Sequence, residues 1–186
     1  MLKHFILFFI LVTSSITQAT ELEDGFQAFT AGNYEQALRL WLPLAEKDNA
    51  GAQYNLGILY MKGLGVEKNL KTAFIWYKRA STNGNTDAMF NLGTMYNKGK
   101  VVSRSPKDAN KWWLKAAELG NAAAQFNIAV EYAYGKNLEK NVDEAIKWWK
   151  KSASQGNKDA RAALHRTYTE GLFGIAVNPQ EAKRWK

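Results

Sequence analysis

A period of 36 residues runs through most of this 186-residue chain. Tyrosine, glycine, alanine and tryptophan each return at this spacing, as in Tyr60, Tyr96 and Tyr132, or in Trp76, Trp112 and Trp148. A repeat of this length is one supersecondary unit, which buries its apolar face only by stacking on neighbouring copies. The period therefore restricts the chain to an array of stacked repeats.

Each repeat reads as two helices, named helix A and helix B. Apolar residues at helical spacing predict helix A over about 52–61 in the first full copy, and Gly63 then ends it. Ser105-Pro106 marks the start of a helix B, and Asn178 followed by Glu181 fits a capping box. The pattern predicts an all-α fold, a right-handed α-solenoid of antiparallel helix hairpins.

Composition excludes several kinds of chemistry. The chain has no cysteine, which excludes a disulfide scaffold, thiolate zinc sites and a cysteine nucleophile. His165 takes the repeat position of Gly57 and Gly93, so it is expected to pack rather than to catalyse. Acidic residues do not show metal-ligand spacing, and glycines do not form a phosphate loop after a strand. We therefore expect a protein that is not an enzyme, with no catalytic residue, cofactor or metal.

The first 19 residues have the features of a secretory signal. Lys3 and His4 precede an apolar run over 5–12, and Thr17-Gln18-Ala19 offers a cleavage site. The run is shorter than the ~20 residues of a membrane-spanning helix, although an uncleaved anchor is an alternative. We expect cleavage after Ala19 and a periplasmic or secreted protein. Nucleic acid is a poor candidate partner for an exported chain.

The spaced residues resemble the Sel-one-like repeat, a relative of the tetratricopeptide repeat. The first copy carries Ala52, Leu56, Gly57, Tyr60, Gly63, Gly65, Val66, Ala73, Trp76, Tyr77, Ala80 and Gly84. Copies are expected over 49–84, 85–120, 121–156 and 157–186, the last with a truncated helix. Residues 20–48 look more like an ordinary tetratricopeptide hairpin. Val101 and Asn137 replace the loop glycine Gly65, so those loops are expected to turn differently.

The resemblance implies a binding scaffold with a 36-residue unit. Secreted bacterial members act as envelope adaptors, regulators of peptidoglycan enzymes or host-contact proteins, so the implied partner is an envelope or host protein. Some cysteine-rich relatives are described as penicillin-binding or weakly β-lactam-hydrolysing. That activity transfers poorly, because this chain has no cysteine pair and no Ser-x-x-Lys motif.

One row of asparagines is the best candidate site. Asparagine is mildly unfavourable inside a helix, yet Asn55, Asn91 and Asn127 recur in helix A. Either they line the concave face and bind a partner's backbone, or each ties down the adjacent loop. Lys62 and Lys98 should share their helical face, which would suit an extended peptide or an acidic C-terminus.

Charge is uneven along the chain. Residues 20–48 carry two basic and six acidic groups, a net of −4, whereas residues 49–186 carry 22 basic and 11 acidic groups, a net of +11. A basic face is expected around one B–A turn, at Lys147, Lys150, Lys151, Lys158 and Arg161. It is either a solvated surface or a site for peptidoglycan or another anionic envelope polymer.

The tryptophans and the C-terminus add two further expectations. In Trp112-Trp113 and Trp148-Trp149, neighbours point ~100° apart, and packing in the core is favoured for both members over a platform for sugar rings. The last helix is expected to span about nine residues and to end at Trp185-Lys186. Such a short end could leave an apolar patch that allows self-association.

Overall fold

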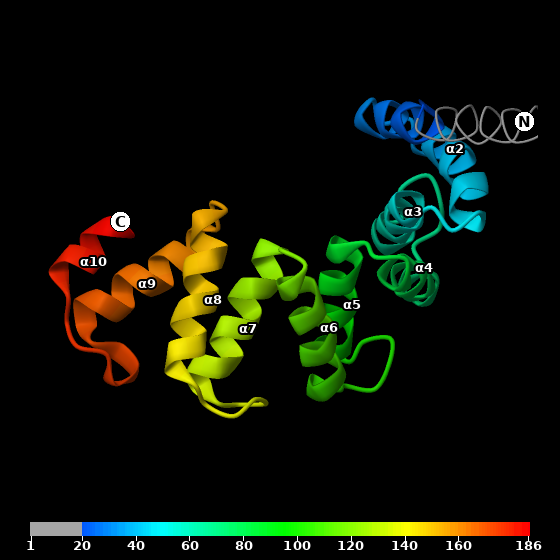
Figure 1. Cartoon of the computed structure of the whole chain (residues 1–186). Helices are drawn as coiled ribbons and strands as arrows, with labels where there is room; N and C mark the ends of the chain where they lie inside the picture. The colour runs from blue at the N-terminus through cyan, green and yellow to red at the C-terminus, as the bar shows by residue number, and fades with distance from the viewer. Residues whose placement is uncertain (1–19) are drawn as a thin grey trace, which may run out of the picture. The chain divides into compact units, whose positions relative to one another are not determined.

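A computed structural model describes residues 20–186, and every regular element in this range is helical (Figure 1). The predicted signal peptide, residues 1–19, lies outside the described residues. A helical segment over 20–30 precedes the labelled helices, which are α2 (Tyr34–Glu46), α3 (Ala50–Lys62), α4 (Leu70–Thr82), α5 (Thr86–Lys98), α6 (Pro106–Glu118), α7 (Ala122–Tyr134), α8 (Val142–Ser154), α9 (Lys158–Glu170), the 3-10 turn η1 (Leu172–Gly174) and α10 (Pro179–Arg184).

Consecutive helices pack as hairpins, with α3 against α4, α7 against α8 and α9 against α10. Helix A of each repeat is thus α3, α5, α7 or α9, and helix B is α4, α6, α8 or α10. The predicted all-α solenoid of helix hairpins with a 36-residue period is confirmed.

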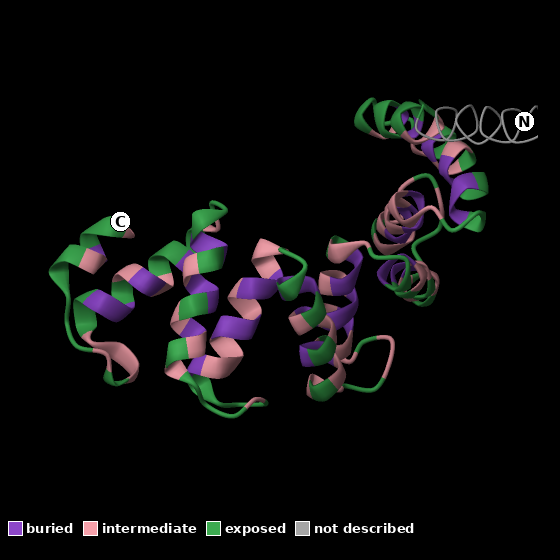
Figure 2. Cartoon of the chain, viewed as in Figure 1, coloured by how far each residue is buried: buried purple, intermediate pink, exposed green. Residues whose placement is uncertain are grey.

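The chain divides into two compact units, residues up to Ala88 and residues from Met89 onward. Unit 1 has a core around Trp41, Leu44, Leu56 and Leu59. Unit 2 has its own core, which includes Trp113, Ile128, Trp148, Trp149 and Leu164. In Figure 2 the buried residues form stripes along the helices, as expected for amphipathic helices packed in pairs.

Asparagine side chains cap the start of the A helices. The side chains of Asn85, Asn121 and Asn157 accept hydrogen bonds from the backbone N–H groups of Ala88, Ala124 and Ala160, at 2.8, 2.9 and 2.9 Å. Each bond satisfies one N–H of the first helical turn. At the other end, Gly63, Gly135 and Gly171 adopt the left-handed conformation with φ of 73°, 64° and 70°.

The start of helix B corrects one expectation. Asn178 accepts from the Glu181 N–H at 3.0 Å, which is the predicted N-cap. The Asn178 N–H, however, donates to the Tyr168 carbonyl at 2.8 Å rather than to Glu181. Asn141 makes the same 2.9 Å bond to Tyr132. The reciprocal half of the capping box is therefore replaced by a bond that ties the A–B loop to helix A.

The A–B loops differ from one another, as the sequence predicts. Gly65 has φ +66°, and a Cβ atom there would lie 2.7 Å from the backbone of Tyr34 and Glu35. This close approach requires glycine. Val101 and Asn137, at the same repeat position, do not have positive φ, so the backbone of these loops turns differently at this residue. The first hairpin turns over only residues 31–33.

The paired tryptophans do not behave alike. Trp113, Trp148 and Trp149 are buried. Trp112 packs against the same core but stays half-buried, so the expected core packing is only partial for this residue. Its outer face lies under Lys115, whose Nζ is 5.7 Å from the ring centroid. The final helix α10 is also shorter than expected, with six residues from Pro179 to Arg184.

Candidate functional site

The asparagine row lies on three A helices, with Asn55 on α3, Asn91 on α5 and Asn127 on α7. All three side chains are half-buried, and none makes a hydrogen bond with another group in residues 20–186. The loop that they were considered to tie down is held instead by backbone bonds, such as Asn69 N–H to Tyr60 O at 2.9 Å. Their amides are therefore free to bind an external group, and a binding role for them stays a prediction.

Asn91 and Asn127 belong to unit 2, and Asn55 belongs to unit 1. The Asn91 and Asn127 side chains thus belong to the same compact unit. Lys62 and Lys98 are the exposed last residues of α3 and α5, where a cation is favoured by the helix dipole.

The residue type at the repeat position of Lys62 and Lys98 differs in α7. The corresponding residue of α7 is Tyr134, which is 58% exposed and meets Phe173 edge-on at a centroid distance of 5.2 Å. Lys136 Nζ lies 5.6 Å from the centroid of the Tyr134 ring. The helix A face therefore carries lysine at the end of α5 and an exposed aromatic ring at the end of α7.

The expected basic face is partly neutralised by the protein itself. Lys147 pairs with Glu144 at 2.9 Å, and Lys150 pairs with Glu181 at 3.4 Å. Lys151 Nζ lies 4.2 Å from the centroid of the Trp148 ring. Lys158 and Arg161, on α9, are exposed and form no ion pair within the described residues.

Glu181 is the acidic group that connects α8 to α10. The pKa of its carboxyl is lowered, first by a hydrogen bond from the Trp185 indole N–H and then by the charge of Lys150. Arg184 adds an ion pair at 3.6 Å. Because Glu181 engages Lys150, this lysine is less available to an external anion.

Three lysines along one side of α6 are not among the candidate site residues that the sequence predicts. Lys107, Lys111 and Lys115 lie four residues apart, so they share one side of the helix, and all three are exposed. They form no ion pair within the described residues. Their i, i+4, i+8 spacing was the signal that could have identified them.

His165 has a packing role, in line with its interpretation as a packing variant. Its Nδ1 lies 2.8 Å from the Ala182 carbonyl oxygen of α10. By the 36-residue register, with one inserted residue, Lys186 stands where Tyr77, Trp113 and Trp149 stand in earlier repeats. A cavity of about 410 Å³ beside it is lined by His165, Thr169, Val177, Pro179, Ala182, Lys183 and Lys186.

In unit 1, the Asp48 carboxylate accepts hydrogen bonds from Gln53 at 3.0 Å, Arg79 at 3.2 Å and Asn83 at 3.3 Å. These bonds, that from Arg79 foremost, lower the pKa of the Asp48 carboxyl. Asp48 has φ +62°, at the repeat position of Gly84. The carboxylate thus joins the turn after α2 to the end of α4.

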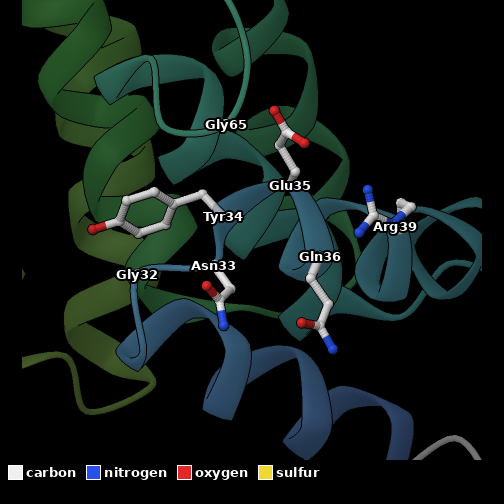
Figure 3. Close-up of a pocket in the computed structure, with 7 residues that line it drawn as sticks. All are labelled: Gly32, Asn33, Tyr34, Glu35, Gln36, Arg39 and Gly65. Carbon is white, nitrogen blue, oxygen red and sulfur yellow. The ribbon is translucent and has the colours of Figure 1, made fainter.

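An opening in unit 1 lies at the start of α2 (Figure 3). Its volume is about 500 Å³, and its lining includes Asn33, Glu35, Arg39 and Gly65. The Tyr34 and Arg39 side chains point in opposite directions there, so they do not converge on one point. The arrangement does not form a constellation that could perform acid–base or nucleophilic chemistry.

Residues 20–186 contain neither a cluster of metal-ligating side chains nor a helix that could span a membrane. No three His, Cys, Asp or Glu side chains in this range are grouped so that they could hold a metal ion. None of its helices combines the length and the hydropathy needed to cross a membrane.

The sequence matches the family model of the Sel1 repeat over residues 21–49, 50–85, 86–121, 122–157 and 160–185. The first match covers the segment that resembles an ordinary tetratricopeptide hairpin, and the choice between these two related repeats stays a prediction there. Comparison of the sequence with curated proteins gives no significant match.

Solved structures of similar fold include a Sel1 repeat protein from Oxalobacter formigenes, 35% identical with a TM-score of 0.80, aligned over 88% of this chain and 67% of that one. Another is c5321, a protective antigen of uropathogenic Escherichia coli strains with an SLR fold, 30% identical with a TM-score of 0.79, over 90% of this chain and 37% of that one. This chain thus spans about two thirds of the first and little more than a third of the second. Helicobacter pylori cysteine rich protein B, at 20% identity and a TM-score of 0.55 over 77% of this chain and 96% of that one, shares the fold.

Proposed function

Because this chain belongs to the Sel1 repeat family, we propose that it is an exported scaffold of the bacterial cell envelope that binds a partner protein on its helix A face. Sel1 repeats generally mediate protein–protein interactions, and scaffolds of this family are typically not enzymes. The leader predicted over residues 1–19 supports export, because a cleaved signal would deliver the folded repeats to the envelope.

The observation that carries the proposal is the pair of unpartnered amides of Asn91 and Asn127. Each asparagine offers one acceptor oxygen and two N–H donors. An extended peptide backbone presents alternating N–H and C=O groups, which can pair with both functions of the amide. Half-buried polar groups gain most from such bonds, since solvent already satisfies them poorly.

Lys98 adds a cation at the end of the same helix as Asn91. A partner segment that carries a carboxylate, from an acidic side chain or a C-terminus, would meet this lysine. Asparagine and lysine together therefore favour an extended, acidic peptide segment of the partner.

The test is partner capture from an envelope fraction by the full chain and by the Asn91→Ala/Asn127→Ala variant. Alanine is the better helix former, so the variant should keep its melting temperature. Loss of two hydrogen bonds at ~1 kcal/mol each should weaken binding of the captured protein about tenfold or more. The matched control, Gln36→Ala/Gln180→Ala, removes two exposed amides elsewhere. Equal binding by wild type and the asparagine variant would refute the site.

Export has its own test. Expression in a Gram-negative host followed by N-terminal analysis of the periplasmic protein should find Thr20 as the first residue. An intact Met1 on protein retained in the cytoplasm would contradict export without affecting the binding site.

A further inference from the structure

In each of the four repeats after the first, a cation lies over a tryptophan ring of helix B or of the residue that ends it. The charged group lies 4.9 Å from the ring centroid for Arg79 over Trp76, 5.7 Å for Lys115 over Trp112, 4.2 Å for Lys151 over Trp148 and 5.6 Å for Arg184 over Trp185. The first three pairs have the same i, i+3 spacing. The contact with the ring thus restricts the conformation of the cationic side chain in each of these four repeats.

In unit 2 a second lysine precedes Trp112 and Trp148. Lys111 and Lys147 complete two copies of the motif Lys-Trp-Trp-x-Lys, on α6 and α8. We define the lysine array as Lys111, Lys115, Lys147 and Lys151, all of which are exposed. Both helices pack against α7, so the array belongs to one compact unit.

The protein neutralises little of this charge. The nearby acidic groups are Asp108, which is engaged by Ser105 at 2.6 Å, Glu118, Asp143 and Glu144. Only Glu144 forms an ion pair with the array, to Lys147 at 2.9 Å. Lys107, Lys111 and Lys115 repel one another along α6 at i, i+4 spacing, and no ion pair in the described residues offsets this cost.

An ordered array of this kind matches a particular ligand. A cation already held over an indole loses less side-chain freedom when it meets an anion, so a stiff partner gains most from it. Because the motif recurs with the repeat, a ligand whose negative charges also recur can engage both helices at once. Trp112 is half-buried, and the part of its ring that Lys115 does not cover adds apolar surface that the C–H face of a sugar ring can contact.

We propose that the helix B face of unit 2 binds a linear acidic polysaccharide through the lysine array. This goes beyond the proposed function, because it uses the opposite helices of the hairpins and a different class of ligand. It also differs from the basic face expected at the B–A turn, since Lys150, Lys158 and Arg161 are not required.

Polygalacturonate is the probe, with poly-L-glutamate as a flexible polyanion and dextran as a neutral polysaccharide. Binding to the full chain is measured by calorimetry at about 50 mM and about 500 mM salt, because screening weakens exposed charge pairs. The array variant is Lys111→Gln/Lys115→Gln/Lys147→Gln/Lys151→Gln. The matched control is Lys68→Gln/Lys71→Gln/Lys100→Gln/Lys140→Gln, which removes the same charge from exposed lysines elsewhere.

We expect polygalacturonate to bind at low salt, with affinity reduced about tenfold or more by the array variant and much less by the control. The four Lys→Arg substitutions at the array should retain binding, which separates loss of charge from loss of fold. The Asn91→Ala/Asn127→Ala variant should bind polygalacturonate as tightly as the wild type does. A failure of the protein-binding proposal can therefore be told apart from a failure of this one. No binding at low salt, equal loss in the control, or equally tight binding of poly-L-glutamate at matched charge would each overturn the proposal.

Discussion

At the residue scale, the size of the side chain at one position of helix A decides how closely the aromatic ring of helix B approaches. At Gly93 a Cβ atom would lie 2.6 Å from Trp113 Cδ1, and the Trp113 indole N–H donates to the Phe90 carbonyl at 3.1 Å. The next repeat has Ala129 at this position, and the Trp149 indole nitrogen is buried without a partner in the described residues. Glycine thus permits a contact in which the indole N–H is satisfied.

Gly93→Ala should therefore lower the free energy of unfolding by about 1–3 kcal/mol, because the added methyl group overpacks the ring. The measurement is urea denaturation followed by circular dichroism. Gly51→Ala is the matched control, since its Cβ would meet nothing closer than 3.4 Å. There the better helix propensity of alanine should leave stability unchanged or raise it by up to ~1 kcal/mol. Equal effects at both glycines would contradict the steric argument.

The hydrogen-bonded Asp48 carboxylate leads to a second prediction at the residue scale, on how the stability of the fold depends on pH. Its folded-state pKa lies below the ordinary 3.8 because Arg79, Gln53 and Asn83 bond to the carboxylate. Its contribution to stability is thus fully present above the unfolded-state pKa and is lost as pH falls through the lower folded-state pKa. Asp48→Asn tolerates the left-handed backbone and does not titrate. The melting temperature of wild type should fall more steeply than that of the variant below about pH 4; parallel curves would exclude this role.

At the scale of the element, side-chain caps define where the helices begin. Asn157 accepts from the Ala160 N–H at 2.9 Å, and this bond satisfies a group that α9 leaves unpaired. The A helices share this cap because the B–A turn repeats, with a glycine of positive φ just before it, as at Gly120 and Gly156. Both signals are local, which is why the sequence predicts these helix starts well.

Asn157→Ala should destabilise the protein by about 1 kcal/mol, whereas Asn157→Ser should have little effect because serine caps nearly as well. Thermal unfolding of the two variants provides the comparison. If alanine and serine behaved identically, the cap would not contribute to the stability of α9.

At the scale of the whole molecule, stability should be distributed repeat by repeat. Each unit has its own buried core, and the contacts that define the hairpins join helices close in sequence. In such an array, stability approximates a sum of repeat and nearest-neighbour contributions. A large defect in one repeat should therefore remain near its origin.

Trp113→Ala removes a ring that is 5% exposed, and it should cost about 3–5 kcal/mol. Hydrogen exchange followed by mass spectrometry should show faster exchange in α6 and α7 and much smaller changes in α2 and α3. Trp112→Ala, which removes the half-buried neighbour, should cost less. A uniform acceleration from α2 to α10 would instead indicate one cooperative folding unit.

The sequence by itself determined the all-α fold, the hairpin period and most helix ends. These features follow from signals a few residues apart, such as a capping asparagine or a glycine after helix A. Tertiary structure decided that Trp113 is buried and Trp112 only half-buried, that Glu181 of α10 pairs with Lys150 of α8, and that Asn91 and Asn127 have no internal partner. These outcomes depend on which groups lie across from a side chain once the helices pack, and the repeat pattern does not specify those neighbours.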